Sequence, residues 1–216
     1  MTEQITPAQF HGADGIEDWR VLTHVAHARF HTKSFAAGVA LVDEIGRLAD
    51  AANHHPDIDL RYGNVTVRLT THSVGGLSKL DIALARQISA AARDLGVAAD
   101  ATALQDVQVT IDALVIPDVM PFWRTVLGYR QVGEEDLLDP HSSGPPIWFQ
   151  QMDAPRPQRN RIHVDIFVPH DQADARVAAA LAAGGHLMND AYAPAWWTLA
   201  DGEGNEVDIA TWMGRD

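Results

Sequence analysis

Three histidines and two aspartates lie at short spacing in one segment of the chain, and they are the residues best suited to chemistry. They are Asp50, His54, His55, His72 and Asp81. Histidine is the side chain whose ordinary pKa lets it gain and lose protons near neutral pH, and a nearby carboxylate can orient it or stabilise its charge. The segment therefore predicts a set of proton-transfer groups that act on a small polar molecule.

Hydrophobic periodicity predicts the elements that carry these groups. Residues 35–52 repeat apolar side chains at helical spacing, and Pro56 stops that helix, so the histidine pair lies at its C-terminal end. Residues 58–62 and 64–71 alternate as a pair of strands, and the third histidine follows where the second strand ends.

The remaining elements complete an α+β unit. Residues 19–32 are interpreted as two short strands, and Ser78 with Asp81 forms a capping-box pattern that begins a last helix. The predicted order is ββαββα, an antiparallel sheet with helices packed on one face. In this order the three histidines lie at element ends around one edge of the sheet, where catalytic groups are commonly displayed.

Each of these residues also has a purely structural interpretation. A histidine pair at a helix C-terminus complements the helix dipole, Asp81 suits a capping position, and Asp50 or His72 suits a solvated surface. Independent structural roles do not predict all these residue types at fixed spacing over more than thirty residues, so the joint pattern favours function. Three further histidines, which could extend the pocket, are interpreted as surface residues because no ligand spacing accompanies them: His24, His27 and His31.

The spacing resembles that of the pterin-4a-carbinolamine dehydratase family. The residues that carry the resemblance are Asp50, His54-His55-Pro56, Tyr62, Thr71-His72 and Gly76-Leu77-Ser78 followed by Asp81. The resemblance implies a hydro-lyase that converts a 4a-hydroxytetrahydropterin to the quinonoid dihydropterin, a step in tetrahydrobiopterin recycling. It implies neither a metal nor an external cofactor for this half of the chain.

The same resemblance implies roles for individual residues. His54, His55, His72 and Asp81 would form the catalytic set, in which one group protonates the departing hydroxyl and another removes a ring N–H proton. Which histidine is the acid and which is the base stays open. The residues that would bind the pterin are Asp50, Asn53, Thr71, Ser73 and Trp19. For Trp19 two roles stay open, a wall of the pocket or a part of the core.

A change in composition divides the chain near residues 96–104. Gly96 ends a helical pattern, small residues follow it, and five of the six tryptophans lie beyond this point. We expect two domains with separate cores, a dehydratase-like domain over residues 1–100 and a second domain over residues 101–216.

Residues 105–212 are interpreted as two copies of a βαβββ module. Three segments of this half stand out: Phe122-Trp123 with Leu127-Gly128-Tyr129, the strand with His163 and Asp165, and the hairpin Asp201-Gly202-Glu203-Gly204-Asn205-Glu206. Through these segments the half resembles the glyoxalase/bleomycin-resistance/extradiol-dioxygenase superfamily. We therefore expect a glyoxalase-like domain over residues 101–216.

The superfamily resemblance implies a metal site in some members, with one ligand from the first and one from the last strand of each module. The corresponding positions are Gln108, Gln150 or Gln151, His163 and Glu206. Glutamine oxygens are weaker ligands than imidazole or carboxylate, so a divalent metal and a metal-free binding site both stay open.

The amino-acid composition limits the classes of binding partner that we expect. The formal net charge is −13, with 9 basic against 12 acidic residues in residues 1–100 and 7 against 17 in residues 101–216. Such a surface predicts neither nucleic acid nor an anionic membrane as a partner. The lack of cysteine, of a secretory pattern and of a membrane-spanning run predicts a cytoplasmic protein.

Two other functions stay open beside the dehydratase. The second half could be the enzyme, as a metal-dependent lyase or dioxygenase. Alternatively the chain could be a non-enzymatic oligomeric binding module, because the resemblance to the dehydratase family implies that such a fold can also serve as an oligomeric scaffold. The intact His54, His55 and His72 favour the enzyme, since a scaffold needs none of them. We therefore expect a pterin substrate and a homo-oligomer.

Overall fold

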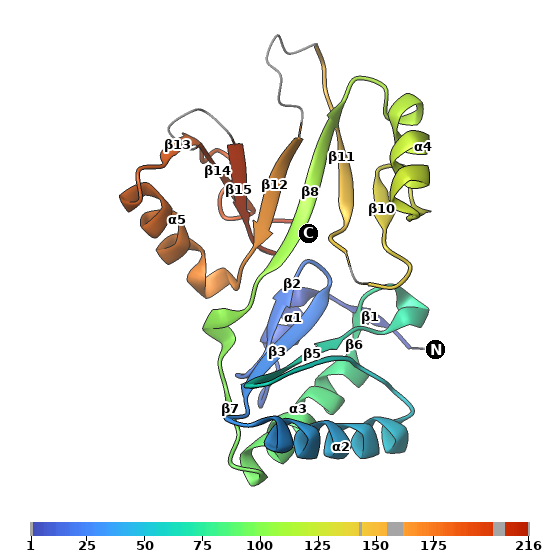
Figure 1. Cartoon of the computed structure of the whole chain (residues 1–216), viewed down its shortest axis with the longest axis vertical. Coiled ribbons are helices and arrows are strands. Elements are labelled where there is room, and N and C mark those ends of the chain that lie inside the picture. Colours follow the sequence, from blue (N-terminus) through green and yellow to red (C-terminus); the bar gives the residue numbers. More distant parts are fainter. Residues whose placement is uncertain (1, 143, 155–161, 201–205, 216) are drawn as a thin grey trace. The chain divides into compact units, whose positions relative to one another are not determined.

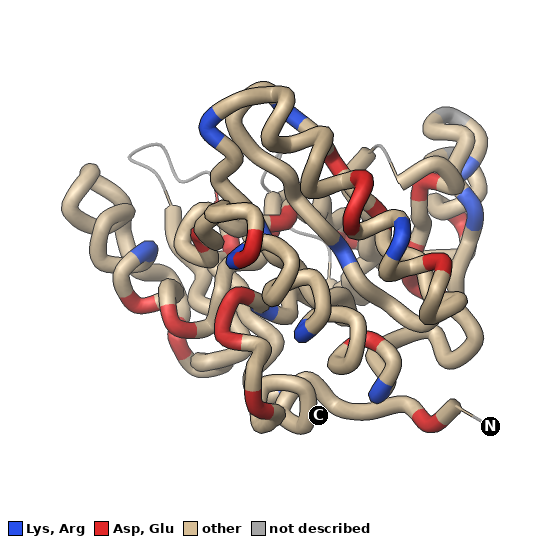
Figure 2. The backbone as a smooth tube through the Cα atoms, turned by 90° about the horizontal axis from the view of Figure 1, so that it is seen from below, with Lys and Arg blue, Asp and Glu red and all other residues tan. Residues whose placement is uncertain are grey.

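The computed structural model describes all residues except 1, 143, 155–161, 201–205 and 216, and leaves out the side chains of Phe122 and Val126. The chain forms two compact units (Figure 1): Met1–Leu104 with Trp212–Asp216, and Gln105–Thr211. Asp and Glu outnumber Lys and Arg in the sequence, 29 to 16, and the acidic residues that the structure describes are spread along the backbone (Figure 2). Among the described residues, no helix is long and apolar enough to cross a membrane.

An antiparallel sheet forms the centre of the first unit. Its order is β2-β3-β5-β4, and the short strand β7 also pairs with β3. The strands are β2 (Arg20–Leu22), β3 (Val25–His31), β4 (Asp57–Arg61), β5 (Asn64–Leu69) and β7 (Ala98–Ala99). Helices α2 (Phe35–Ala52) and α3 (Lys79–Asp94) cover one face of this sheet (Figure 1). The predicted α+β arrangement is confirmed.

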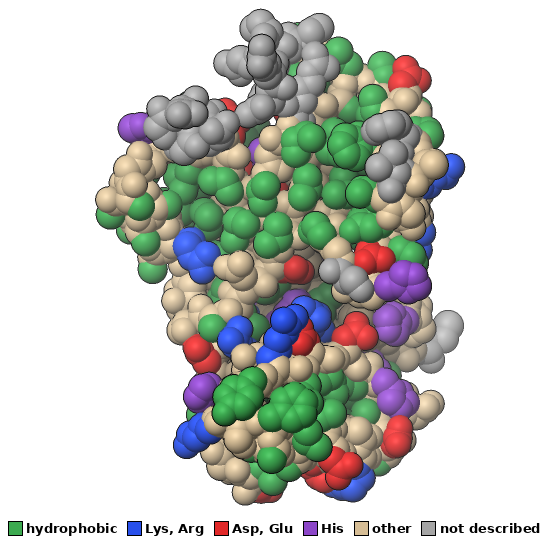
Figure 3. All heavy atoms as spheres, viewed as in Figure 1, with side chains coloured by type: hydrophobic (Ala, Val, Ile, Leu, Met, Phe, Trp, Pro, Cys, Tyr) green, Lys and Arg blue, Asp and Glu red, His purple; other side chains and the backbone are tan. Residues whose placement is uncertain are grey.

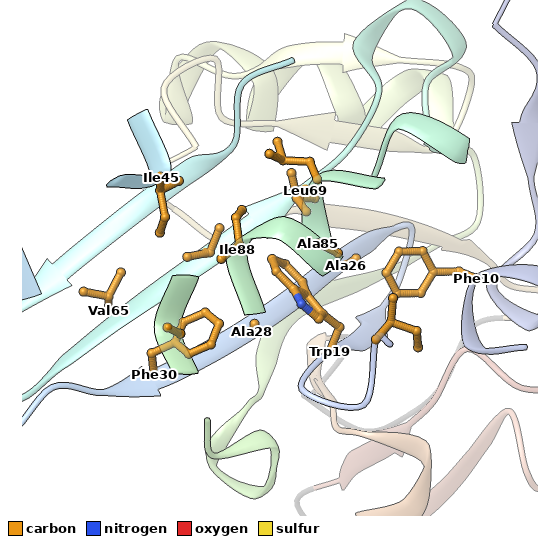
Figure 4. Packing of buried hydrophobic residues seen from close by; sticks show 14 of the residues in the cluster. Phe10, Trp19, Ala26, Ala28, Phe30, Ile45, Val65, Leu69, Ala85 and Ile88 are labelled. Atoms are coloured by element: carbon orange, nitrogen blue, oxygen red, sulfur yellow. The ribbon is translucent and has the colours of Figure 1, made fainter. Parts of the chain in front are cut away.

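Alternation along the strands decides which face the helices cover, because successive side chains in a strand point to opposite sides. Every second residue of β3 and β5 is fully buried, and the helices contribute apolar side chains from one stripe each. The core includes Ala26, Ala28, Phe30, Val65, Val67, Leu69, Leu41, Ile45, Leu84 and Ile88. Figure 4 shows several of these residues packed around Trp19.

Trp19 belongs to this core. It is 0 % exposed, its Nε1–H donates to Ser89 Oγ at 3.0 Å, and its ring meets that of Phe30 edge-on with centroids 6.4 Å apart. A side chain with no exposed area cannot line a substrate pocket. The assignment of Trp19 to the pterin site is therefore corrected, and of its two open roles the core is the one it has.

The elements predicted for the first unit are present, and the structure adds β7 and a group of short elements that involve the N-terminus. The helix expected over residues 35–52 is α2, and the capping box that begins α3 is confirmed. The prediction lacks β1 (Gln4–Ile5), which pairs with β6 (Leu77–Ser78), and α1 (Pro7–His11). A local signal for α1 was available, because the residues around Pro7 form a capping box of their own.

His27 is buried, which corrects its interpretation as a surface residue. It lies on β3 opposite Arg20 on one side and Arg68 on the other. His27 is 3 % exposed, and its Nε2 has no hydrogen-bond partner in the described part of the chain. Burial lowers the pKa of His27 from 6.5 to about 3, and the positive charge of Arg68 acts in the same direction.

This buried histidine predicts a loss of stability on acidification. Below pH 6.5 the unfolded chain binds a proton at His27 that the folded chain does not bind until about pH 3. The folded protein therefore keeps its full stability above pH 6.5. It loses stability as the pH falls from 6.5 toward about 3. Between about pH 7.5 and pH 5 the free energy of unfolding should fall by about 2 kcal/mol through this group.

Denaturant titrations at the two pH values check this expectation. The protein with His27→Gln should lose less stability over the same range, by about the same 2 kcal/mol, because it no longer carries the titrating group. Equal losses in the two proteins would show that His27 does not control the effect.

The C-terminal tail belongs to the first unit. Trp212 packs against the core of that unit and stacks on His11, with ring centroids 5.5 Å apart and an interplanar angle of 17°. The Nε2 of His11 in turn accepts the backbone N–H of Val21 at 3.2 Å. The first unit is therefore built from both ends of the chain.

One eight-stranded sheet forms the second unit, with the order β13-β14-β15-β12-β8-β11-β10-β9. The strands are β8 (Asp106–Ala113), β9 (Arg130–Val132), β10 (Asp136–Leu138), β11 (Ile147–Gln151), β12 (Ile162–Phe167), β13 (His186–Asn189), β14 (Trp196–Ala200) and β15 (Glu206–Ala210). Strands β8 and β12 pair antiparallel, and each pairs in parallel with the last strand of its own module. The predicted pair of βαβββ modules is confirmed.

Each module packs its own helix against its strands. Helix α4 (Ile116–Leu127) shares a core with Ile111, and α5 (Ala173–Ala182) shares one with Ile209. Figure 3 shows hydrophobic side chains gathered over the middle of this unit on the face in view. Along β8 the apolar Val109 and Ile111 alternate with Gln108 and Thr110, which therefore point to the opposite face of the sheet. Residues 201–205 of the predicted hairpin lie outside the described residues.

Candidate functional site

His54 lies just beyond the end of α2. Asn53 caps this helix in the left-handed conformation, with φ 48° and ψ 42°, and the N–H of His54 donates to the carbonyl of Ala49 at 3.1 Å. Asparagine adopts this conformation more readily than most residues. The turn leaves His54 buried, at 8 % exposure, while the next residue, His55, is exposed.

The imidazole of His54 meets a buried carboxylate. His54 Nε2 lies 2.8 Å from Asp81 Oδ1, and Asp81 is 0 % exposed. The other oxygen of Asp81, Oδ2, accepts the N–H of Ser78 at 2.7 Å and the hydroxyl of Thr71 at 2.6 Å. Asp81 thus caps α3 with one oxygen and holds His54 with the other.

The hydroxyls of Thr71 and Ser78 continue this network. They lie 2.7 Å apart, and Ser78 Oγ accepts the N–H of Leu80 at 3.1 Å. The backbone N–H of Thr71 donates to the carbonyl of Gly76 at 2.8 Å, which fixes the loop between them. Both hydroxyl residues are buried, so the network is shielded from water.

His55 contacts a second carboxylate at the surface. Its Nε2 lies 2.9 Å from Asp50 Oδ1, and the two side chains are 58 % and 83 % exposed. An exposed pair of this kind adds little to stability. It leaves the imidazole of His55 accessible to a solute.

The third histidine is also accessible. His72 and Ser73 lie in the short turn η1 (His72–Val74), which follows β5, and both are exposed. Asn53 is exposed at the cap of α2. The motif therefore combines one buried and oriented imidazole with two accessible ones and with polar side chains that a solute can reach.

Burial bears on two of the predicted roles. Asp81 is 0 % exposed and has both carboxylate oxygens inside the network, so it contacts His54 rather than a solute. Thr71 is buried as well, and its hydroxyl is engaged with Asp81 and Ser78. Ser78 belongs to the same network, although the sequence predicted it only as a helix cap. Its place in the Ser-x-x-Asp capping pattern was the available signal.

A second cluster lies on the sheet of the second unit. His163 and Asp165 are two residues apart on β12, and Asp208 on β15 is the register partner of Asp165, so the three project from one face. His163 Nε2 lies 3.3 Å from Asp165 Oδ1 and 3.7 Å from Asp208 Oδ2. Donor atoms around a cation with bonds of about 2.1 Å lie about 3–4 Å apart. The three side chains therefore fit one divalent cation.

Asp208 occupies the place in this cluster that the sequence assigned to Glu206. Glu206 begins β15 and is exposed, and within the described residues it is not one of the three clustered donors. Strand alternation puts both acids on one face, but Asp208 is the one paired with Asp165. Gln108 lies opposite Asp165 on β8 and shares its face.

Two further side chains support this sheet. The hydroxyl of the fully buried Thr110 donates to Asp165 Oδ2 at 2.8 Å, and such a bond orients a ligating carboxylate. The side-chain amide of Gln151 donates to the carbonyls of Leu114 and Met152, both at 2.8 Å. Gln151 is thereby held against the backbone at the end of β11.

Comparison with known proteins matches the two units to two families. Residues 2–91 match the family described as pterin 4 alpha carbinolamine dehydratase, and residues 108–210 match a glyoxalase-like domain. A relative from Nocardia farcinica, provisionally named pterin-4-alpha-carbinolamine dehydratase, is 46 % identical over 78 residues, which are 36 % of this chain and 82 % of that protein. A relative of the same provisional name from Mycobacterium tuberculosis is 37 % identical over 90 residues, 42 % of this chain and 93 % of that protein.

A solved structure from Brucella melitensis, named transcriptional coactivator/pterin dehydratase, is 27 % identical. It covers 42 % of this chain and 99 % of its own, with a TM-score of 0.40. The two sequence relatives are matched over most of their own length. The chain therefore belongs, through its first unit, to the pterin-4a-carbinolamine dehydratase family, and its second unit is a glyoxalase-like domain.

Proposed function

We propose that the first unit dehydrates a 4a-hydroxytetrahydropterin to the quinonoid dihydropterin. The observation that carries this proposal is the buried contact between His54 and Asp81, which fixes one imidazole inside a motif whose other two histidines are accessible. Membership of the dehydratase family supports the same substrate class.

The reaction needs two proton transfers. The bond between ring carbon 4a and the hydroxyl oxygen breaks, and the oxygen leaves as water after it gains a proton. A ring N–H proton is removed, and its electron pair forms the new C=N bond. Donor and acceptor side chains in opposite protonation states can supply both transfers near neutral pH.

We assign one transfer to His54 and the other to an accessible histidine, His72 or His55. Asn53 and Ser73 are the exposed polar residues next to these histidines in the chain, and they would hydrogen-bond the polar edge of the pterin ring. Asp50 would act through His55, with which it is paired.

Turnover of a synthetic 4a-hydroxytetrahydropterin tests the proposal. In a stopped-flow measurement, the absorbance of the quinonoid product should rise faster than in buffer, in proportion to the concentration of protein. A rate that does not depend on the protein would reject the dehydratase proposal and favour a binding or scaffold role.

We further propose that the second unit binds one divalent cation. The observation behind this second candidate is the cluster of His163, Asp165 and Asp208, whose donor atoms all lie within 4.8 Å of one another. One imidazole with two carboxylates suits Mn²⁺, Fe²⁺ or Zn²⁺. A bound cation of this kind would supply Lewis-acid chemistry, while the three side chains would hold it and Thr110 would orient Asp165.

Metal titration by calorimetry checks this candidate. The wild-type protein should bind about one equivalent of Mn²⁺ or Zn²⁺, and His163→Ala or Asp208→Asn should weaken that binding at least about 100-fold, because each removes a direct ligand. Glu206→Gln is the matched control, since it lies on the same strand outside the cluster. If Glu206→Gln weakens binding and Asp208→Asn does not, the cluster is wrongly assigned.

A further inference from the structure

Two backbone donors determine the direction of the hydrogen bonds around Asp81. The N–H of Leu80 donates to Ser78 Oγ, and the N–H of Ser78 donates to Asp81 Oδ2. A backbone N–H can only donate. The Thr71 hydroxyl donates its one hydrogen to Asp81 Oδ2 at 2.6 Å, so in its contact with Ser78 Oγ, 2.7 Å away, the hydrogen comes from Ser78.

The opposite direction leaves a buried group unsatisfied. If Thr71 donated to Ser78, the hydroxyl hydrogen of Ser78 would have no acceptor among its contacts, and Ser78 is 0 % exposed. Leaving a buried donor unpaired costs about 1–3 kcal/mol. When Ser78 donates to Thr71 and Thr71 donates to Asp81, every hydroxyl hydrogen of the network has an acceptor. Oδ2 of Asp81 then accepts two hydrogens, as an ionised carboxylate does.

This arrangement fixes the tautomer of His54. Oδ1 of the ionised carboxylate can only accept, so Nε2 of His54 carries a hydrogen whether the imidazole is neutral or cationic. The nitrogen that gains or loses a proton is therefore Nδ1.

Nδ1 is also the nitrogen that a substrate can reach. Within the described residues, the hydrogen bond of the His54 ring is the one made by Nε2. Nδ1 is not among the buried polar atoms that lack a partner, and 9 % of the side chain stays accessible. The free lone pair of Nδ1 accordingly meets the surroundings rather than the protein.

We infer that His54 exchanges protons with the substrate at Nδ1 alone, and that Thr71 and Ser78, acting through Asp81, are positioning residues that hold it in this tautomer. The part played in catalysis rests on the proposed dehydratase function. The tautomer itself does not, because it follows from the hydrogen bonds around an ionised Asp81.

Replacing the carboxylate by an amide tests the inference in the full-length protein. In Asp81→Asn, the amide oxygen should stay on the side of the Ser78 N–H and the Thr71 hydroxyl, and the amide NH₂ should face His54. The imidazole must then accept at Nε2 and carry its proton on Nδ1. The same logic explains why an aspartate-to-asparagine change in a Ser-His-Asp triad gives the wrong tautomer.

Nitrogen–proton correlation spectra distinguish the two tautomers. The signals of His54, one of eleven histidines, are identified by their loss in His54→Gln. In the wild-type protein the proton should lie on Nε2, and in Asp81→Asn on Nδ1, with pterin turnover lowered about 10²–10⁴-fold. A wild-type proton on Nδ1, or an Asp81→Asn protein that keeps it on Nε2, would overturn the inference.

Two variants of Thr71 keep the test independent of the helix cap. Thr71→Val removes the hydroxyl but keeps the shape of the side chain. It should lower kcat about 10-fold, the lower limit of the effect expected when a residue that orients a functional side chain through a hydrogen bond is lost. KM should change little, and Thr71→Ser should restore most of the rate. An unchanged kcat in Thr71→Val would reject the positioning role.

The result also separates this inference from the proposed function. If the tautomer switches in Asp81→Asn but the wild-type protein does not turn over the pterin, the tautomer assignment stands and the dehydratase proposal falls. If the wild-type protein is active and the tautomer does not switch, the dehydratase proposal stands and the inference falls.

Discussion

Replacing His54 by Gln is expected to lower pterin turnover about 10²–10⁴-fold, the usual range for the loss of a general acid or base. The glutamine amide can still donate to the buried Asp81, which His54 meets at 2.8 Å, so the network around the start of α3 should survive. Steady-state rates with the synthetic pterin measure the loss, and circular dichroism checks the fold. The expected result is a folded protein with little activity.

His72→Gln should lower pterin turnover by a similar factor if His72, rather than His55, supplies the second proton transfer. His186→Gln serves as the matched control, because His186 is an exposed histidine on β13 of the second unit. Its turnover should equal that of the wild-type protein. Unchanged rates in both His54→Gln and His72→Gln would remove the assignment of the proton-transfer groups.

A fragment of residues 1–104 is expected to fold and to dehydrate the pterin at close to the full-length rate. Every residue assigned to the reaction lies before residue 104, and the core of the first unit is built almost wholly from this fragment. Residues 105–211 alone should show no turnover. The difference between the two fragments should therefore be nearly complete.

The fragment should nevertheless be less stable than the first unit in the whole chain. It lacks Trp212, which stacks on His11 and packs against the core. Losing a partly buried tryptophan should lower the free energy of unfolding by about 1–2 kcal/mol, below the range for a fully buried one. Joining residues 212–216 to the fragment through a flexible linker should restore part of the lost free energy of unfolding. A fragment that is folded but inactive would mean that the second unit completes the site or the assembly.

Local rules were enough to predict most elements of the first unit. The apolar spacing over residues 35–52 predicted α2, and the Ser78 and Asp81 capping pattern predicted the start of α3, because both depend on residues within a few positions of one another. The duplicated modules of the second half were visible for the same reason. Strand β1 was not, since a two-residue strand has too little periodicity and forms by pairing with β6 far along the chain.

Residue types and spacing also predicted which residues form the candidate site, but they did not decide the role of each residue. Only the tertiary structure buries Asp81, Thr71, Trp19 and His27 and places Asp208 rather than Glu206 beside His163. Burial and hydrogen-bond direction depend on contacts such as that of His54 with Asp81, which are 27 residues apart. The sequence by itself therefore determined the chemical groups and their family. The fold decided which of these groups are exposed and which are buried, because burial is a property of packing between distant segments.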